Sequence, residues 1–373
     1  MKRLILRITM VLIAVLGVIL MLPVPVPADG WKQAITQRSW HFPKDHGAHP
    51  DYRTEWWYFT GNLVGEKSNR YGYQLTFFRQ GIQTERKNRR NAWSIHDVYL
   101  AHFAISDVGN GSFWFSEQVS RPGPGLAGAS THGMDVWCLN WRARMKNGRV
   151  LLDAKHGGTY LRLELIPRKP VVLHGENGLS RKGPLGGQAT YYYSFTDLET
   201  KGILKTEKMS DPVNVTGKSW FDQEFGSHQL SAEQVGWDWF SLHLSDGRDL
   251  MIYMLRRKDG TVEPSSSGTL VEKNGRARHL KLQDIDIKPL AHWKSPASGG
   301  LYPSRWQIRI PPADISLVFS TTITNQELDT AGSTGVIYYE GTVSGKGTSS
   351  HKPLTSEGYV EMTGYAGSIG GVI

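Results

Sequence analysis

Two short aromatic stretches decide the fold that this sequence predicts: Glu55-Trp56-Trp57-Tyr58-Phe59 and Gly236-Trp237-Asp238-Trp239-Phe240. After a short turn, each is followed by an apolar stretch that ends in an arginine, Arg79 in the first copy and Arg256 in the second. Because aromatic residues favour strands, each copy predicts a β-hairpin. Two copies nearly half the chain apart indicate two tandem domains of one fold, residues 29–210 and 211–373, unless two unrelated hairpins coincide.

Strand signals recur along the whole chain, whereas helical periodicity is nearly absent. Short stretches rich in aromatic and β-branched side chains end at Gly, Asn, Asp or Pro, which is the usual pattern of strands and turns. The clearest predicted strands cover residues 55–63, 71–79, 98–106, 159–166, 190–197, 237–244, 249–256, 306–310, 315–322 and 335–342. Many short strands at this spacing predict an all-β chain of antiparallel barrels or sandwiches with few helices.

The first 28 residues have the layout of a secretory signal. Lys2, Arg3 and Arg7 accompany an apolar run over residues 8–22, and Ala28 offers a small residue for cleavage. The run is shorter than the roughly 20 residues that a membrane-spanning helix needs, so we prefer cleavage, with an uncleaved membrane anchor as the alternative. In both cases we expect an exported protein of the periplasm or cell envelope.

Charge and cysteine content narrow the classes of partner. The formal charge is +9, and removing Lys2, Arg3 and Arg7 leaves +6, spread along the chain apart from a basic run at residues 86–90. We therefore expect no nucleic acid; the basic run is either a solvated loop or a contact for an anionic membrane surface. The single cysteine, Cys138, excludes an internal disulfide and is expected to be a small core side chain.

Motifs of the common cofactor and metal enzymes are missing from the sequence. A complete phosphate-binding loop, a His-Glu-x-x-His motif and a Gly-x-Ser-x-Gly elbow are all absent. Residues 41–50 hold three histidines and Asp45 among prolines and a glycine, but their spacing matches no strong metal pattern. We expect no cofactor and no metal, and a loop that lays His46 against a barrel entrance.

Alternation along the first aromatic strand places an acid among aromatic rings. Glu55 and Trp57 face one side of this strand, and Trp56 and Tyr58 face the other. If Trp57 points into a barrel, Glu55 does too, and a buried carboxylate then needs a partner. Arg79, at the end of the partner strand, is the expected counter-ion. The pair is either a structural latch that closes the barrel or part of a ligand contact with the neighbouring aromatic rings.

A second cluster combines acids with indoles. Trp220, Asp222 and Glu224 share one face of a predicted strand, whereas Asp238 lies on the opposite side from the two tryptophans that flank it. Burial disfavours the charged form, so an acid in this cluster is expected to stay protonated near neutral pH, as a general acid must. Indole faces also stabilise a developing carbocation. The alternative is that these acids only cap turns of the hairpins.

The same stretches resemble the carotenoid 1,2-hydratase and AttH-like family of lipocalin-type proteins. The resemblance is carried by residues 41–58, 72–79, 98–107 and 220–239, and it extends over nearly all of the mature chain. It implies two tandem lipocalin-like β-barrels with a ligand site in or between them. Family members include cofactor-free hydratases of terminal isoprenoid double bonds, polyketide cyclases and predicted secreted hydrolases, so the resemblance does not by itself fix the activity.

For a hydratase, the resemblance implies an acid that protonates the alkene, a wall that shields the cation and a base that orients water. The candidates for these roles are the acids Asp238, Asp222 and Glu224, the indoles of Trp220, Trp237 and Trp239, and the bases His46 and His102. Because export would separate the protein from carotenoid synthesis, we expect a lipid, isoprenoid or other hydrophobic ligand of the envelope. The alternative is a non-catalytic lipid carrier or an accessory protein of a membrane transporter.

Overall fold

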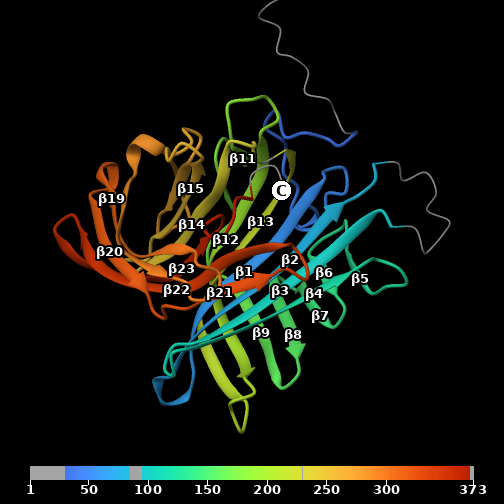
Figure 1. Cartoon of the computed structure of the whole chain (residues 1–373), viewed down its shortest axis with the longest axis horizontal. Helices are drawn as coiled ribbons and strands as arrows, with labels where there is room; N and C mark the ends of the chain where they lie inside the picture. The colour runs from blue at the N-terminus through green and yellow to red at the C-terminus, as the bar shows by residue number, and fades with distance from the viewer. Residues whose placement is uncertain (1–29, 85–94, 229, 370–373) are drawn as a thin grey trace, which may run out of the picture.

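The computed structural model describes residues 30–84, 95–228 and 230–369, which form two large antiparallel sheets (Figure 1). The strands of the first sheet are β1 (Thr54–Val64), β2 (Arg70–Gly81), β3 (Asp97–Asp107), β4 (Ser112–Ser120), β5 (Ala127–Ala129), β6 (Asp135–Cys138), β7 (Trp141–Lys146), β8 (Arg149–His156), β9 (Thr159–Pro167), β10 (Val172–Leu173), β11 (Leu179–Arg181), β12 (Ala189–Lys205) and β13 (Val213–His228). Those of the second sheet are β14 (Gln234–Leu244), β15 (Asp249–Arg257), β16 (Ser267–Val271), β17 (Ala277–Lys281), β18 (Asp286–Lys294), β19 (Leu301–Ile310), β20 (Ile315–Thr321), β21 (Glu327–Thr330), β22 (Val336–Ser349) and β23 (Lys352–Met362). The helices of the described residues are single 3-10 turns: η1 (Lys44–His46), η2 (Glu66–Ser68), η3 (Leu282–Asp284) and η4 (Pro311–Ala313).

The two sheets repeat one strand order. The first runs β4-β3-β2-β1-β13-β12-β9-β8-β7-β6-β5, with β10 and β11 paired to β12, and the second runs β17-β16-β15-β14-β23-β22-β20-β19-β18, with β21 paired to β22. In each, the Trp-rich strand lies between its hairpin partner and the last strand of the sheet. The first sheet curls until β6 lies against β2, β3 and β4. The all-β, lipocalin-like prediction is confirmed, and all ten predicted strands overlap observed ones.

The predicted division of the chain at residues 210 and 211 differs from the division between the sheets. Strand β13 follows that boundary in sequence, yet it hydrogen-bonds to β1 along one edge and to β12 along the other. It is therefore an integral strand of the first sheet. The chain passes to the second sheet only between His228 and Gln234, because the first sheet needs β13 to cover the free edge of β1.

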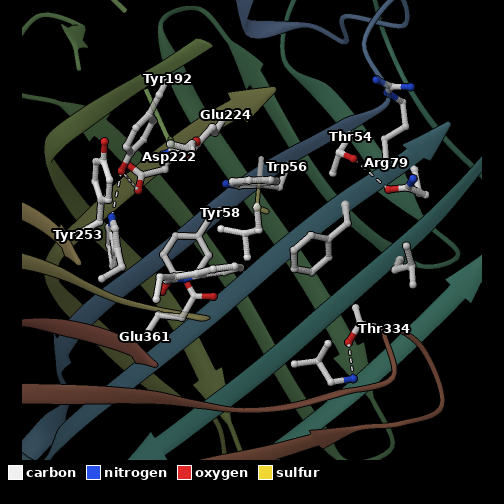
Figure 2. Close-up of a pocket in the computed structure, with 18 of the residues that line it drawn as sticks. Thr54, Trp56, Tyr58, Arg79, Tyr192, Asp222, Glu224, Tyr253, Thr334 and Glu361 are labelled. Carbon is white, nitrogen blue, oxygen red and sulfur yellow. Dashed lines mark hydrogen bonds and ion pairs between the residues drawn. The ribbon is translucent and has the colours of Figure 1, made fainter. Parts of the chain in front are cut away.

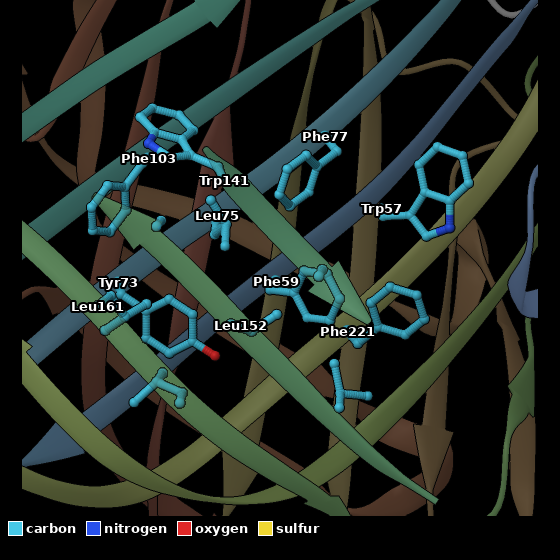
Figure 3. Packing of buried hydrophobic residues seen from close by; sticks show 14 of the residues in the cluster. Trp57, Phe59, Tyr73, Leu75, Phe77, Phe103, Trp141, Leu152, Leu161 and Phe221 are labelled. Carbon is cyan, nitrogen blue, oxygen red and sulfur yellow. The ribbon is translucent and has the colours of Figure 1, made fainter. Parts of the chain in front are cut away.

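The interior of the first sheet is a packed core of alternate side chains (Figure 3). Trp57 and Phe59 of β1 point into it together with Phe221 of β13, and the rings of Phe59 and Phe221 stack at 4.6 Å. Cys138 is fully buried in the same cluster, as predicted for a small core side chain. Because side chains fill this interior, the strands that surround it offer their other face for a site.

The outer faces of the central strands are buried as well, because the two sheets pack against each other. Strand β1 lies against β23, and β2 and β3 lie against β22. An aromatic cluster fills this interface with side chains from both sheets, among them Tyr58, Tyr192 and Trp220 of the first and Trp239 and Tyr253 of the second. Strands buried on both faces need apolar residues at successive positions, which explains runs such as the aromatic stretch of β1.

Two features named in the sequence lie outside the described residues: the proposed export signal at residues 1–28 and the basic run at residues 86–90. Over the described part of the chain, no helix has the length and hydrophobicity required to span a bilayer.

A close contact between the two sheets, at Gly72 of β2 and Thr342 of β22, gives a direct test of their packing. A Cβ atom added at Gly72 would lie 2.0 Å from the Cγ2 methyl of Thr342 on the other sheet. We expect Gly72→Ala to destabilise the protein by about 1–3 kcal/mol through this overlap. Thr342→Ser removes the methyl group but keeps the hydroxyl, so it should restore stability in the double variant. Urea unfolding of the wild type, the two single variants and the double variant measures the coupling between the two substitutions. If their effects on the free energy of unfolding simply add, residues 72 and 342 are not in contact.

Candidate functional site

A cavity of about 290 Å³ lies between the two sheets, and both sheets line it (Figure 2). Its walls are largely aromatic. Trp56 and Tyr58 of β1 and Phe78 of β2 face Trp237 and Trp239 of β14 across it. Three carboxyl side chains and one lysine also line it: Asp222, Glu224, Glu361 and Lys182. The cavity therefore combines an apolar wall with a small number of converging polar groups, as small-molecule sites generally do.

Asp222 is held in place by hydrogen bonds from three sides. It accepts them from the Tyr192 hydroxyl at 2.7 Å, from the Trp220 indole Nε1 at 2.6 Å and from the Ser194 hydroxyl. Burial nevertheless raises its pKa to about 7, because desolvation penalises the carboxylate more than these three donors stabilise it, and the charge of Glu224 acts in the same direction as burial. Asp222 therefore changes protonation state near neutral pH.

The donors to Asp222 belong to a network that crosses the interface. The Trp239 indole Nε1 of the second sheet donates a hydrogen bond to the Tyr192 oxygen at 3.0 Å, and the Tyr192 hydroxyl in turn donates one to Asp222. Behind Ser194, the buried ring of His174 lies 2.6 Å from the serine oxygen through Nε2. Burial lowers the pKa of His174 to about 3, so this imidazole is neutral. The network fixes the orientation of Asp222 at the wall of the cavity.

Glu224 and Lys182 form a buried ion pair next to Asp222. The Lys182 Nζ lies 2.8 Å from the Glu224 Oε1, and the ammonium also lies 4.1 Å from the centre of the Tyr253 ring. Burial lowers the pKa of Lys182, but the neighbouring acidic groups, Glu224 first among them, together more than offset this effect, so the pKa ends above its ordinary value. Lys182 is therefore a charged partner of Glu224 rather than a free amine nucleophile.

Glu361 of β23 is the third acid of the cavity. Burial raises its pKa to about 8, and the neighbouring charges of Asp222 and Glu224 act in the same direction. Its cross-strand partner is Glu340, a fully buried acid that accepts a hydrogen bond from the Tyr58 hydroxyl at 2.7 Å. Burial also raises the pKa of Glu340 well above its ordinary value, so this acid stays protonated. Two neighbouring carboxyl groups thus hold protons on this side of the cavity at neutral pH.

Most of the sequence candidates lie at this cavity. Seven of them line it, and Trp220 lies behind Asp222 as its hydrogen-bond donor. Six of the seven are Trp56, Tyr58, Asp222, Glu224, Trp237 and Trp239. Arg79 lines it as well, although its guanidinium is bound to Asp97 at 2.8 Å and to main-chain carbonyl groups.

Asp238, named first among the candidate acids, lies outside the cavity. Strand alternation turns it to the opposite face of β14 from Trp237 and Trp239. There it pairs with Arg256 at 3.1 Å and accepts a hydrogen bond from the Tyr365 hydroxyl at 3.1 Å. Burial raises its pKa even though Arg256 opposes the change. Asp238 therefore belongs to the interior of the second sheet and does not touch a molecule in the cavity.

Glu55 and Trp57 also face away from the cavity, into the interior of the first sheet. Glu55 lies 3.4 Å from its cross-strand partner Arg79 and 2.8 Å from the His49 ring. His49 in turn lies 3.2 Å from Asp45, so this network fastens residues 41–50 to β1 and β2. Of the two interpretations of the Glu55 and Arg79 pair, this geometry favours the structural latch.

The two candidate bases lie in different places. His46 is buried in the interior of the first sheet, with Nδ1 2.7 Å from the Tyr193 oxygen, and burial lowers its pKa to about 4. His102 lies in the interface, where Nδ1 is 2.7 Å from the Tyr338 oxygen and Nε2 is 2.8 Å from the Ser333 oxygen. Burial lowers its pKa to about 3. Only His102 reaches the cavity, and it does so through Ser333.

Sequence reasoning missed several residues of the cavity, above all Glu361, Lys182 and Tyr192. Tyr192 lies on a predicted strand, but nothing distinguished it from the neighbouring tyrosines. In β23, Glu361 lies two positions after Tyr359, so the two side chains share one face of the strand. Glu55 was noticed because it has the same spacing to Trp57. Lys182 comes from a loop after β11, where periodicity gives no signal.

Among the described residues, no three His, Cys, Asp or Glu side chains are grouped closely enough to hold a metal ion.

Comparisons with known proteins place this geometry in a family. The sequence profile of the AttH-like family matches residues 33–365. The crystal structure of a candidate AttH from Nitrosomonas europaea has a TM-score of 0.79 and 31% identity, over 90% of this chain and 99% of that one. Kievitone hydratase from Nectria haematococca has a TM-score of 0.68 at 15% identity, over 91% and 97% of the two chains.

CghA has a TM-score of 0.51 at 10% identity, over 92% of this chain and 97% of that one. At these identities, kievitone hydratase and CghA share the fold alone with this protein. No curated protein sequence matches the chain. The profile match over most of the chain and the relative at 31% identity show that this protein belongs to the AttH-like family.

Proposed function

We propose that this protein is a cofactor-free enzyme of the hydratase type, which protonates a hydrophobic substrate in the cavity between its two sheets. The observation that carries the proposal is the pair of acids, Asp222 and Glu361, on an otherwise aromatic wall. Burial raises their pKa values to about 7 and about 8. A general acid works best when its pKa lies near the working pH, and both groups meet that condition.

The proposed reaction adds water to a carbon–carbon double bond. The π electrons of the alkene take the proton of the Asp222 carboxyl group, which forms a new C–H bond and leaves a carbocation beside a carboxylate. The indole faces of Trp56 and Trp239 shield the cation, since the ring quadrupole attracts positive charge. A water oxygen then forms the C–O bond, and its surplus proton returns to Asp222. The sum is the addition of one water molecule, without an external oxidant or reductant.

The ion pair of Glu224 with Lys182 supports this choice of acid. Lys182 forms its direct ion pair with Glu224, at 2.8 Å, and not with Asp222. Asp222 is instead surrounded by neutral donors, the hydroxyl groups of Tyr192 and Ser194 and the indole of Trp220. Neutral donors permit protonation more readily than an ammonium group does. Glu361 is the second candidate for the general acid, and the buried Glu340 lies beside it on the neighbouring strand.

The size of the cavity limits what can enter. About 290 Å³ is at the lower end of the range of small-molecule pockets, which is roughly 300–1,000 Å³. A compact hydrophobic molecule, or the reacting end of a longer lipid or isoprenoid, fits this volume. One structural neighbour carries the name of a hydratase, which is consistent with the proposal, although at 15% identity it contributes only the fold.

The alternative function is a carrier of a lipid or other hydrophobic molecule, in support of a transporter of the envelope. The aromatic lining favours this alternative as much as it favours catalysis, because both need an apolar cavity. The buried acids separate the two, since a carrier gains nothing from carboxyl groups that are costly to bury. A carrier would release its ligand unchanged when protein isolated without detergent is extracted and analysed by mass spectrometry.

We expect Asp222→Asn to lower turnover by about 100-fold or more, because it removes the proton donor. The assay uses a panel of hydrophobic alkenes in heavy-oxygen water, and mass spectrometry detects the labelled alcohol. Turnover by the unchanged protein should fall as the pH rises above about 7, where Asp222 loses its proton.

Asp238→Asn is the matched control for this experiment, because it makes the same change on the opposite face of the sheet. It should keep most of the turnover if circular dichroism shows an intact fold. Full activity of Asp222→Asn on a substrate accepted by the wild-type protein would disprove the assignment of the acid.

The pH dependence of stability tests the protonation of Glu361. The folded protein keeps a proton up to a pKa of about 8, whereas the unfolded chain releases it near 4.5. Between these values the folded state binds more protons, so this group makes the free energy of unfolding fall as the pH rises. Glu361→Gln has no such proton to lose. Its stability relative to wild type should therefore rise across this window and become constant above about pH 8.

Urea unfolding followed by tryptophan fluorescence at several pH values measures this difference. The exposed Glu66→Gln, which makes the same change on the surface, serves as the control. Parallel curves for wild type and Glu361→Gln would show that Glu361 titrates as in the unfolded chain.

Export is also part of the proposal, and it rests on residues 1–28. Secreted protein collected from the cell envelope should begin at Asp29, because cleavage is expected after Ala28. Mass spectrometry of the intact protein measures the N-terminus. A full-length mass in the membrane fraction would favour the uncleaved anchor, and a full-length protein in the cytoplasm would contradict export.

A further inference from the structure

A second cavity, of about 1000 Å³ and open to solvent, lies elsewhere along the cleft between the sheets. We call it the basic groove. Both sheets line it, with Arg70 and Lys218 from the first and His243, Arg305 and Lys346 from the second. Strand β14 supplies Trp239 to the aromatic cavity and His243 to the basic groove, so the two sites are displaced along the same strand.

The two cavities are separated by packed aromatic side chains. The Trp220 ring lies between the Trp239 ring, at 6.2 Å, and the His243 ring, at 6.0 Å. Trp220 and Tyr359 are each only 1% exposed. A ligand in the basic groove therefore does not extend into the aromatic cavity, and the two sites can be tested independently.

Positive charge in the basic groove exceeds negative charge. Of its four lysine and arginine side chains, only Lys218 has an acidic partner among the described residues, Asp197 at 3.4 Å. Arg70, Arg305 and Lys346 have no ion pair within the described part of the chain. The acid that lines the groove is Glu357. This surplus contrasts with the other outer faces of the protein, where arginines such as Arg149 and Arg162 pair with neighbouring acids.

His243 gives the basic groove a buried and rigid polar group. Its Nδ1 lies 2.9 Å from the Oδ1 of Asp249, and the ring is only 6% exposed. Asp249 is itself held by the Lys169 Nζ at 2.6 Å and by the Thr196 hydroxyl at 2.8 Å. These contacts fix the ring, and its other nitrogen, Nε2, has no hydrogen-bond partner among the described residues. A histidine oriented by a buried carboxylate is a usual means of presenting the second ring nitrogen to a ligand.

We propose that the basic groove binds an anion of the phosphate class. The His243 ring lies at the buried end and, in its imidazolium form, donates from Nδ1 to Asp249 and from Nε2 to the anion, and Arg70, Arg305 and Lys346 surround the opening. A phosphate group offers several acceptor oxygens and up to two negative charges, which suits separated guanidinium and ammonium groups. Free phosphate compounds and phospholipid headgroups share this chemistry. The proposal does not depend on catalysis in the aromatic cavity.

The experiment measures binding of inorganic phosphate by calorimetry and binding of vesicles by co-sedimentation. One set of vesicles contains phosphatidylglycerol and the other only phosphatidylcholine, which has no net charge. Wild-type protein is expected to bind inorganic phosphate, phosphatidylglycerol vesicles or both, with weaker binding at high salt. The double variant Arg70→Ala/Arg305→Ala should bind about tenfold more weakly or worse, because two charge-assisted hydrogen bonds are lost. Both arginines are exposed and form no ion pair with another described residue, so the fold should be retained.

Arg149→Ala/Arg162→Ala is the matched control, since it removes the same charge from exposed ion pairs on the first sheet. It should bind as wild type does. A shift of the His243 ring nitrogen signals in NMR on addition of phosphate, absent from the groove variant, places the anion at this residue. Saturable binding of phosphate without vesicle binding identifies a free phosphate compound, and vesicle binding identifies a headgroup. Absence of both in wild type, or equal losses in the two double variants, overturns the proposal.

Discussion

The structure depends on the burial of both faces of its central strands. In the central parts of β1 and β13, side chains of one parity pack into the core of the first sheet, as Phe59 does, and side chains of the other parity meet the second sheet, as Tyr58 does. Phe221 therefore belongs to the core, whereas its neighbours Trp220 and Asp222 belong to the interface between the sheets, where Asp222 lines the cavity. The acids are held by strands that cannot move without disturbing the core, which keeps them desolvated and raises their affinity for protons.

Much of the fold followed from local patterns. Aromatic stretches closed by turn residues located the strands, and alternation placed Trp57 and Glu55 on the inner face and Trp56 and Tyr58 on the outer one. Local patterns could not locate the boundary between the sheets, because the place of β13 beside β1 depends on pairing between residues far apart in the sequence. Alternation also placed Asp238 on the opposite face of its strand from Trp237 and Trp239. It does not tell which of the two faces will line a cavity. Lys182 and Glu361 reach the cavity through tertiary contacts alone.

The interface between the sheets joins two environments of opposite electrostatic character. At the aromatic cavity, carboxyl groups are concentrated among rings and retain protons near neutral pH. At the basic groove, cations gather near solvent around a buried imidazole. The layer formed by Trp220 and Tyr359 keeps the two apart. One cleft between two sheets therefore provides two separate binding environments, and neither sheet alone could form either of them.

The pairing of β1 with β13 has a consequence for how the chain folds. Residues near position 54 must find residues near position 226 before the first sheet is complete. Such non-local contacts give a high contact order and slow folding, because a long loop must close first. During synthesis, β1 leaves the ribosome well before its partner and presents an unpaired, aromatic edge in the meantime. Chaperone protection of the nascent chain should therefore matter most over the interval between these two strands.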